Sequence, residues 1–204
     1  MKQDTEKIII EAACKVFYEK GYNGTTMRDI AQTAGVNLAL LHYYFRTKDK
    51  IFEIVFSDAF TSLFKKISQA LTSDADIFEK IKLMITGYVQ TAQKHPQLPG
   101  FVMHEMAVNS QLMLPIIMKY KEQNHVVNLF DNFYVEIEEA GKKGIIKKIN
   151  PESLCTDILS LSFFPFMAKN YLTELIYKDK KTFNLMVKQR IEHITNSVIS
   201  NIIV

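Results

Sequence analysis

The chain has 204 residues, and 48% of them are hydrophobic, which is enough to bury a sizeable core. Its net charge of +3 at pH 7 is too small to identify a nucleic-acid binder by itself, since residues 1–50 hold eight Lys and Arg against six Asp and Glu. The chain contains only seven glycines and five prolines, which favours long helices joined by few turns.

Two cysteines, Cys14 and Cys155, each lie in an apolar helical pattern without metal-ligand spacing. They are therefore predicted to be buried free thiols in a reducing compartment. The first residues show no apolar secretion signal, and no hydrophobic run reaches the length that a bilayer requires. We expect a soluble, cytoplasmic protein that does not enter a membrane.

A first helix is predicted to run to about Lys20, with apolar residues recurring at steps of three and four along it. Asp4 or Thr5 can cap its beginning. Gly21 is expected to end it in the left-handed conformation that glycine adopts most easily. This helix would contribute one buried stripe to an N-terminal unit.

Residues 25–52 predict a helix-turn-helix. Thr25 or Thr26 offers a hydroxyl to cap the second helix, and Asp29 stands three residues after Thr26 in an approximate capping box. Gly35 allows the sharp turn that follows. Such a pattern alone also fits a packing unit that binds no ligand, so the content of the third helix decides between the two interpretations.

The third helix, capped by Asn37, is predicted to end near Phe45 and to turn Leu41 and Phe45 inward. The opposite side is too apolar and aromatic for a helix that touches only water, because it carries Leu38, Ala39, His42 and Tyr43. We therefore expect this face to bind a partner.

A long fourth helix follows, capped by Thr47, with Asp49 in its first turn and an apolar face that continues to about Leu71. Lys48 and Lys50 stand at its start, where ammonium groups and main-chain N–H groups can meet a phosphate. No flexible linker precedes this helix, so it is expected to couple the N-terminal unit rigidly to the rest of the chain.

The remainder reads as further helices, with no strand-like alternation. One helix is expected to begin at Asn150 and Pro151 and to kink near Pro165. The predicted fold is all-α, with about nine helices in total, and the helices beyond the fourth cover about residues 77–94, 101–108, 113–141, 151–177 and 181–203.

The N-terminal segment resembles the DNA-binding domain of the TetR/AcrR family of bacterial transcriptional regulators. The resemblance covers about a quarter of the chain and rests on Gly21, Thr25, Thr26, Ile30-Ala31, Ala34-Gly35-Val36, Tyr43-Tyr44-Phe45 and Lys48. It implies a helix-turn-helix domain over residues 1–50, a connecting fourth helix over 48–71, and a dimerisation and effector-binding domain over 51–204.

Carried over residue by residue, the resemblance implies two kinds of DNA contact. Phosphates would be met by Thr26, Tyr43, Tyr44 and Lys48. Base edges would be met by Arg28, Asn37, Leu38 and Ala39. Arg28 can form a bidentate contact with guanine. Its alternative roles are a solvated surface arginine or a partner of a group near Asp29.

Four positions depart from the commonest family pattern: Asn37, Ala39, His42 and Ile51. His42 replaces a tyrosine that often contacts DNA in the family. An imidazole can also donate to a phosphate or a base edge, so His42 is included among the candidate DNA-binding residues.

The last two helices are predicted to form a homodimer through a four-helix interface, because the final helix carries a long apolar stripe. Burial of that stripe within one chain is the alternative. A dimer would read a palindromic operator on double-stranded DNA, with two recognition helices about 34–36 Å apart in successive major grooves.

The C-terminal aromatic and methionine residues favour a small apolar effector, although most of them would be ordinary core. His104 and Glu105 are the most suggestive polar pair. The candidate pocket residues are Phe101, His104, Phe130, Tyr134, Phe163, Phe166, Met167 and Tyr171.

The predicted function is a ligand-responsive repressor that an effector releases from its operator. No Gly-rich phosphate loop, catalytic triad order or HExxH pattern occurs, and the histidines lack ligand spacing, so no enzyme, cofactor or metal is expected. The main alternative is a helical protein–protein adaptor in which the helix-turn-helix is only scaffold. Gel shift with the upstream region of its own gene separates the two.

Overall fold

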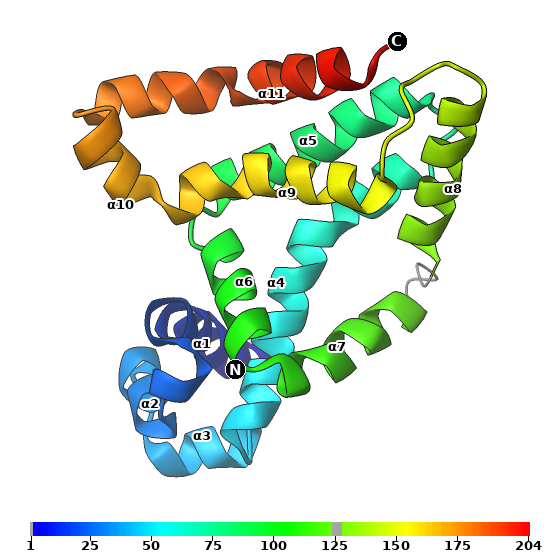
Figure 1. The fold of residues 1–204 in the computed structure, drawn as a ribbon. Coiled ribbons are helices and arrows are strands. Elements are labelled where there is room, and N and C mark those ends of the chain that lie inside the picture. The colour runs from blue at the N-terminus through cyan, green and yellow to red at the C-terminus, as the bar shows by residue number, and fades with distance from the viewer. Residues whose placement is uncertain (1, 124–127) are drawn as a thin grey trace. The chain divides into compact units, whose positions relative to one another are not determined.

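The computed structural model describes residues 2–123 and 128–204, and its described elements are helices, as predicted, apart from one isolated bridge between Ile146 and Ile203 (Figure 1). The chain forms two compact units. Unit 1 comprises Met1–Thr61 and Gly100–His125, and unit 2 comprises Ser62–Pro99 and Val126–Val204. Each unit is built from segments that are distant in sequence.

The first helix, α1 (Lys2–Gly24), bends at Gly21, where φ is 66° and ψ is 177°. The positive φ is one that glycine adopts easily, but Gly21 does not end the helix as expected, because α1 continues to Gly24. The predicted cap is wrong, because α1 already begins at Lys2 and both Asp4 and Thr5 lie inside it. Its apolar stripe is buried, with Ile9 and Phe17 fully inaccessible.

The predicted helix-turn-helix is present as α2 (Met27–Ala34) and α3 (Leu38–Tyr44). Thr26, rather than Thr25, is the N-cap of α2, and Thr26 and Asp29 form a complete capping box. Gly35 takes the left-handed conformation, with φ 68° and ψ 27°. The Asn37 side chain accepts a hydrogen bond from the Leu40 N–H at 2.7 Å and so caps α3.

The fourth helix, α4 (Lys48–Leu71), begins in unit 1 and continues into unit 2. The Thr47 hydroxyl accepts from the Lys50 N–H at 3.3 Å, which confirms the predicted cap. The predicted single helix over 113–141 is wrong. It is instead α7 (Ser110–Gln123) and α8 (Leu129–Lys142), and residues 124–127 of the predicted helix lie outside the described residues.

Unit 1 is larger than the predicted domain over residues 1–50, because α6 (Leu98–Val108) contributes to the same core. The Phe101 ring lies 4.8 Å from the Tyr18 ring and 6.0 Å from the Phe52 ring, measured between centroids. Phe52 also packs edge-on against Phe17 at 4.9 Å. Aromatic contacts of this kind join α6 to α1 and α4.

In unit 2, α5 (Ile77–Lys94), α9 (Pro151–Met167) and α11 (Lys180–Ile202) pack together (Figure 1). Asn150 caps α9 and Pro151 is its first residue, as predicted. Past Met167 the chain forms the three-residue α10 (Lys169–Tyr171) and a π-helical turn, η1 (Leu172–Ile176). The helix predicted to kink and continue to about residue 177 is therefore interrupted.

Pro165 explains a contact between α9 and α11. A proline has no N–H, so the Leu161 carbonyl four residues earlier loses its helical partner. Arg190 replaces that partner, donating to the Leu161 oxygen from Nη2 at 2.7 Å and from Nε at 3.1 Å. The guanidinium therefore satisfies a main-chain group that the helix cannot.

The apolar stripe of α11 faces the inside of unit 2, where Phe183, Ile194, Val198 and Ile202 are buried. The other two members of the predicted stripe, Val187 and Ile191, are half-buried, so most of the stripe lies in the core of unit 2. The cysteines are free and half-buried, and burial raises the pKa of Cys14 to about 11.

Among the described residues, no helix is long and apolar enough to cross a membrane. In the same part of the chain, no group of three His, Cys, Asp or Glu residues is placed to hold a metal.

Candidate nucleic-acid interface

The helix-turn-helix turns its predicted contact residues outward. Leu41 and Phe45 are buried, as predicted, so the opposite side of α3 faces solvent. Tyr43 is 68% exposed. Five of the remaining predicted residues are exposed: Thr26, Arg28, Asn37, Ala39 and His42. The other three are half-buried: Leu38, Tyr44 and Lys48.

Arg28 lies in the first turn of α2 and makes no hydrogen bond or ion pair with another described residue. Its neighbour Asp29 is already engaged, because it accepts from Lys20 Nζ at 2.7 Å and from the Thr26 main chain at 2.8 Å. Lys20 and Thr26 hold the pKa of Asp29 well below its usual range. An exposed guanidinium without a protein partner is able to reach an external acceptor.

Two residues of α3 are partly committed to the protein itself. The Asn37 side-chain oxygen caps the helix, which leaves its amide N–H groups for a base edge. The His42 Nδ1 lies 3.3 Å from the Arg46 carbonyl, an acceptor, so this hydrogen bond requires the proton on Nδ1. The neutral ring then presents Nε2 as an acceptor.

Lys48 is held more tightly than its sequence context indicates. Its ammonium group donates to the carbonyl oxygens of Tyr22 at 2.8 Å and Thr25 at 3.1 Å. It also lies 4.0 Å from the centre of the Tyr22 ring. Two of its three N–H groups are therefore used inside unit 1, so Lys48 joins the end of α1 to the start of α4.

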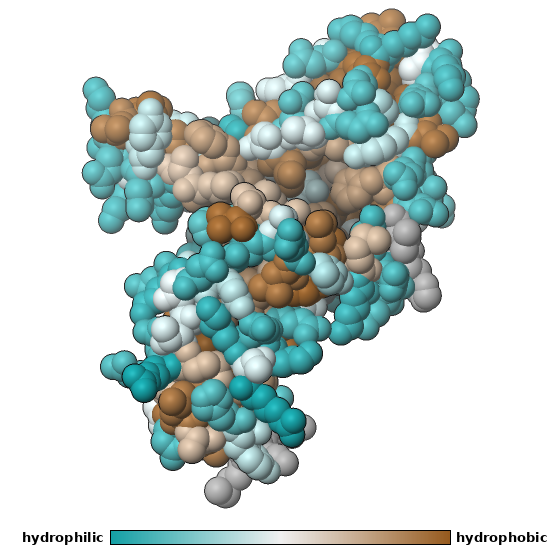
Figure 2. Space-filling view, turned by 60° about the horizontal axis from the view of Figure 1, so that its bottom comes forward, coloured by the Kyte–Doolittle hydropathy of each residue, from teal (hydrophilic) through white to brown (hydrophobic). Residues whose placement is uncertain are grey.

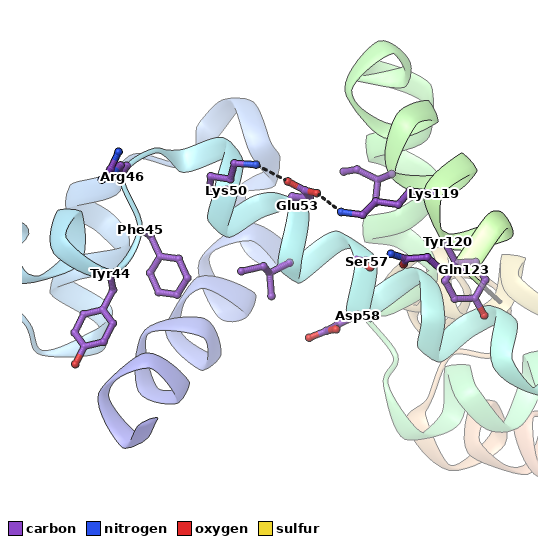
Figure 3. Close-up of a pocket in the computed structure, with 12 residues that line it drawn as sticks. Tyr44, Phe45, Arg46, Lys50, Glu53, Ser57, Asp58, Lys119, Tyr120 and Gln123 are labelled. Carbon is purple, nitrogen blue, oxygen red and sulfur yellow. Dashed lines mark hydrogen bonds and ion pairs between the residues drawn. The ribbon is translucent and has the colours of Figure 1, made fainter. Parts of the chain in front are cut away.

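Unit 1 also contains a groove of about 640 Å³ between the end of α3, α4 and α7 (Figure 3). Glu53 lies between the ammonium groups of Lys50 and Lys119, at 3.2 Å from each. Lys119 and Lys50 lower the pKa of Glu53. Lys50, expected to meet a phosphate, is therefore paired with a carboxylate here. The groove lining also includes Tyr44, Phe45, Arg46, Ile54, Ser57, Asp58, Ile116, Tyr120 and Gln123.

The structure does not bring the eight predicted effector-pocket residues together within one unit. Phe101 is core of unit 1, and His104 is exposed in the same unit. In unit 2, Phe130 and Tyr134 lie 6.3 Å apart, and Phe163 packs against Tyr88 at 5.0 Å. Of the last three residues, Phe166 is buried, whereas Met167 and Tyr171 are 50% and 55% exposed.

Comparison with known proteins identifies the same region of the chain. The model of a family described as "Bacterial regulatory proteins, tetR family" matches residues 9–55. The "Probable HTH-type transcriptional regulator YttP" of Bacillus subtilis is 28% identical over 179 residues, which cover 87% of this chain and 84% of that protein. The biofilm operon negative transcriptional regulator IcaR of Staphylococcus aureus is 47% identical over 45 residues, 22% of this chain and 24% of that protein.

The fold is shared over almost the whole chain with a solved TetR family transcription regulator from Marinobacter aquaeolei. That structure has a TM-score of 0.68 at 18% identity and covers 100% of this chain and 99% of its own. These relatives are transcription regulators rather than enzymes, in agreement with the sequence prediction.

Proposed function

Because this chain belongs to the TetR family of bacterial regulatory proteins, we propose that it is a homodimeric repressor that binds a palindromic operator and leaves it when a small effector binds. The chain is a DNA-binding transcription regulator. Repression, the dimer interface, the operator and the effector are the proposed parts. IcaR is named a negative regulator, which supports repression here.

The exposed face of α2 and α3 supports the proposed mode of DNA binding. Arg28 is exposed and has no partner among the described residues, and it would read one guanine through two hydrogen bonds. Tyr43 and Thr26 would contact phosphates, which set the register without reading sequence. Leu38 and Ala39 offer no hydrogen-bonding side-chain group, so DNA shape would contribute to specificity.

The proposed dimer interface uses the exposed side of α9 rather than the buried stripe of α11. Leu161, Phe164 and Met167 recur at steps of three on α9 and are 37%, 56% and 50% exposed. Tyr171 and Leu175 continue the exposed apolar surface along α10 and η1. Figure 2 shows hydrophobic residues gathered at the α10 end, at the left of the view. A contiguous apolar surface of this kind favours an interface, here with a second copy of the chain.

The proposed effector is a small apolar molecule bound among the aromatic residues of unit 2. The nine methionines and fourteen phenylalanines of the chain support that chemical class. A hundredfold preference of the effector for the conformation that does not bind DNA corresponds to about 2.7 kcal/mol. By linkage, effector and operator must weaken each other's binding equally.

A gel shift with the DNA upstream of its own gene tests the proposal against the adaptor alternative. The proposed regulator retards this duplex, and its affinity falls steeply as salt rises, because phosphate contacts release counterions. An adaptor that uses the helix-turn-helix only as scaffold would leave the duplex unretarded at every salt concentration. Adding apolar compounds to the bound complex then screens for the effector by release of DNA.

A further inference from the structure

Glu105 is a fully buried carboxylate on α6, with no accessible surface. Its Oε1 accepts from the Tyr22 N–H at 2.9 Å, and its Oε2 accepts from the Asn109 side-chain amide at 2.6 Å. Burial of a charged group is costly unless hydrogen bonds replace its water. The two bonds account for the burial, and one of them reaches the end of α1.

Gly21 makes the close approach of Glu105 possible. A Cβ atom at this position would lie 3.0 Å from Glu105 Oε1, and the φ of 66° also disfavours any side chain. The bend of α1 at Gly21 therefore exposes the Tyr22 N–H to the carboxylate. The Asn23 side-chain amide also donates to the Asn109 side-chain oxygen at 3.3 Å. Glu105 and Asn109, both in unit 1, therefore hold the bend.

Tyr22 passes this contact on to the helix-turn-helix. Its carbonyl accepts from Lys48, its ring lies beneath the same ammonium group, and its hydroxyl donates to Asp49. Lys48 also holds the Thr25 carbonyl, one residue before the cap of α2. A continuous set of contacts thus links Glu105 to the first turn of α4 and the start of α2.

We infer that Glu105 is a positioning residue for DNA binding, which acts through Tyr22 and Lys48 without touching DNA. This inference rests on the proposed DNA-binding function. The carboxylate fixes the bend of α1, and the bend fixes the position of the Lys48 ammonium group relative to α2. The contact surface of α2 and α3 is then held in one arrangement before DNA arrives, which avoids an ordering cost on binding.

The test measures the affinity of the full chain for a fluorescent duplex carrying the DNA upstream of its own gene. Glu105→Leu removes both acceptors and is expected to weaken binding about 10-fold or more. Glu105→Gln keeps one oxygen for the Tyr22 N–H and is expected to restore most of that loss. Glu122→Leu, at an exposed position on α7 of the same unit, is the matched control and leaves the affinity unchanged.

A double-mutant comparison separates positioning from general destabilisation. If Glu105 acts through Lys48, then Glu105→Leu combined with Lys48→Met weakens binding no more than Lys48→Met alone. If the fold-loss of affinity in the double variant equals the product of the fold-losses in the two single variants, the inference is overturned. An unchanged affinity in Glu105→Leu would overturn it as well. All affinities are measured at a temperature where circular dichroism shows the variants fully folded.

Asn109→Ala serves if Glu105→Leu does not fold, because it removes one of the two hydrogen bonds to the Glu105 side chain and leaves that side chain in place. It is expected to weaken binding about threefold, again without multiplying the effect of Lys48→Met. An unchanged affinity in this variant would overturn the inference. Failure of the unaltered chain to bind the duplex is a different result, which would contradict the proposed function itself.

Discussion

The ammonium group of Lys48 donates to the main-chain carbonyl of Tyr22 at 2.8 Å and lies 4.0 Å from the centre of the same residue's ring. Removing that group takes one donor from the Thr25 carbonyl and leaves the Tyr22 carbonyl with the Thr25 N–H, which donates to it at 3.3 Å. Lys48→Met should therefore lower the free energy of unfolding by roughly 1.5–3 kcal/mol. Urea denaturation measures the change, with Lys65→Met, at an exposed position on the same helix, as the control. Equal stability of the two variants would show that the bonds contribute nothing.

Arg28 is expected to determine sequence preference without supporting the fold. It is exposed and has no partner among the described residues. Arg28→Ala should therefore leave the unfolding free energy unchanged, while preference at one base pair of the half-site falls by about 1–3 kcal/mol. Competition with duplexes altered at one position at a time measures this preference. A uniform loss over all duplexes would instead identify Arg28 as a phosphate contact.

Arg190 should stabilise unit 2 because it replaces the hydrogen-bond donor that Pro165 lacks. Arg190→Ala leaves the Leu161 carbonyl unpartnered and is expected to cost roughly 1.5–3 kcal/mol of unfolding free energy. Lys188→Ala, at an exposed position on the same helix, provides the control for loss of a positive charge. Denaturant titration of the three proteins decides the matter, and coincident curves would exclude a stabilising role for Arg190.

The hydroxyl of Tyr22 should make stability depend on alkaline pH. Its hydrogen bond to Asp49, with burial as the second cause, raises the pKa of Tyr22 to about 12 from an ordinary value of about 10. The protonated form is favoured in the folded state, so its contribution is complete below pH 10 and is lost as the pH rises through about 12.

Tyr22→Phe should accordingly lose less stability than the unaltered chain between about pH 10 and 12. Burial also raises the pKa of Tyr18 and of Tyr88, so both proteins keep some dependence on pH. Unfolding free energies measured by urea titration at successive pH values provide the comparison. Parallel curves for the two proteins would contradict a raised pKa at Tyr22.

Phe164 lies at the centre of the proposed dimer surface and is 56% exposed. Phe164→Glu places a charge in that apolar interface and should convert the dimer to a monomer, since an unpaired buried charge is costly. Analytical ultracentrifugation reports the mass directly. Val135→Glu alters an equally exposed apolar residue on α8 and should remain dimeric. Monomers in both variants, or in neither, would argue against the α9 surface.

The elements of the helix-turn-helix could be predicted because their signals are local. Asn37 caps an N–H three residues away, and Gly35 forms the turn by its own conformation. The contacts of Lys48 with Tyr22 and of Tyr22 with Glu105 join residues 26 and 83 positions apart. No spacing rule connects residues at such distances, so the sequence indicated neither contact.

Helical periodicity identifies a buried face but not what covers it. The α11 stripe was a candidate dimer interface on that basis, and unit 2 itself covers most of the stripe. The same limit applies to Phe101, whose aromatic character suits a pocket as well as a core. Its partners Tyr18 and Phe52 lie on helices that are distant in sequence, and they place it in the core of unit 1.

Selection from a pool of random duplexes tests whether the chain recognises a palindromic operator as a dimer, because it makes no assumption about the operator sequence. We expect enrichment of inverted repeats whose half-sites lie about one helical turn apart, with two chains bound to each duplex. When the same selection is made with Arg28→Ala, the base preference at one position of each half-site should be lost. A pool that shows no enrichment, or that converges on a single unrepeated site bound by one chain, would contradict dimeric recognition of a palindromic operator.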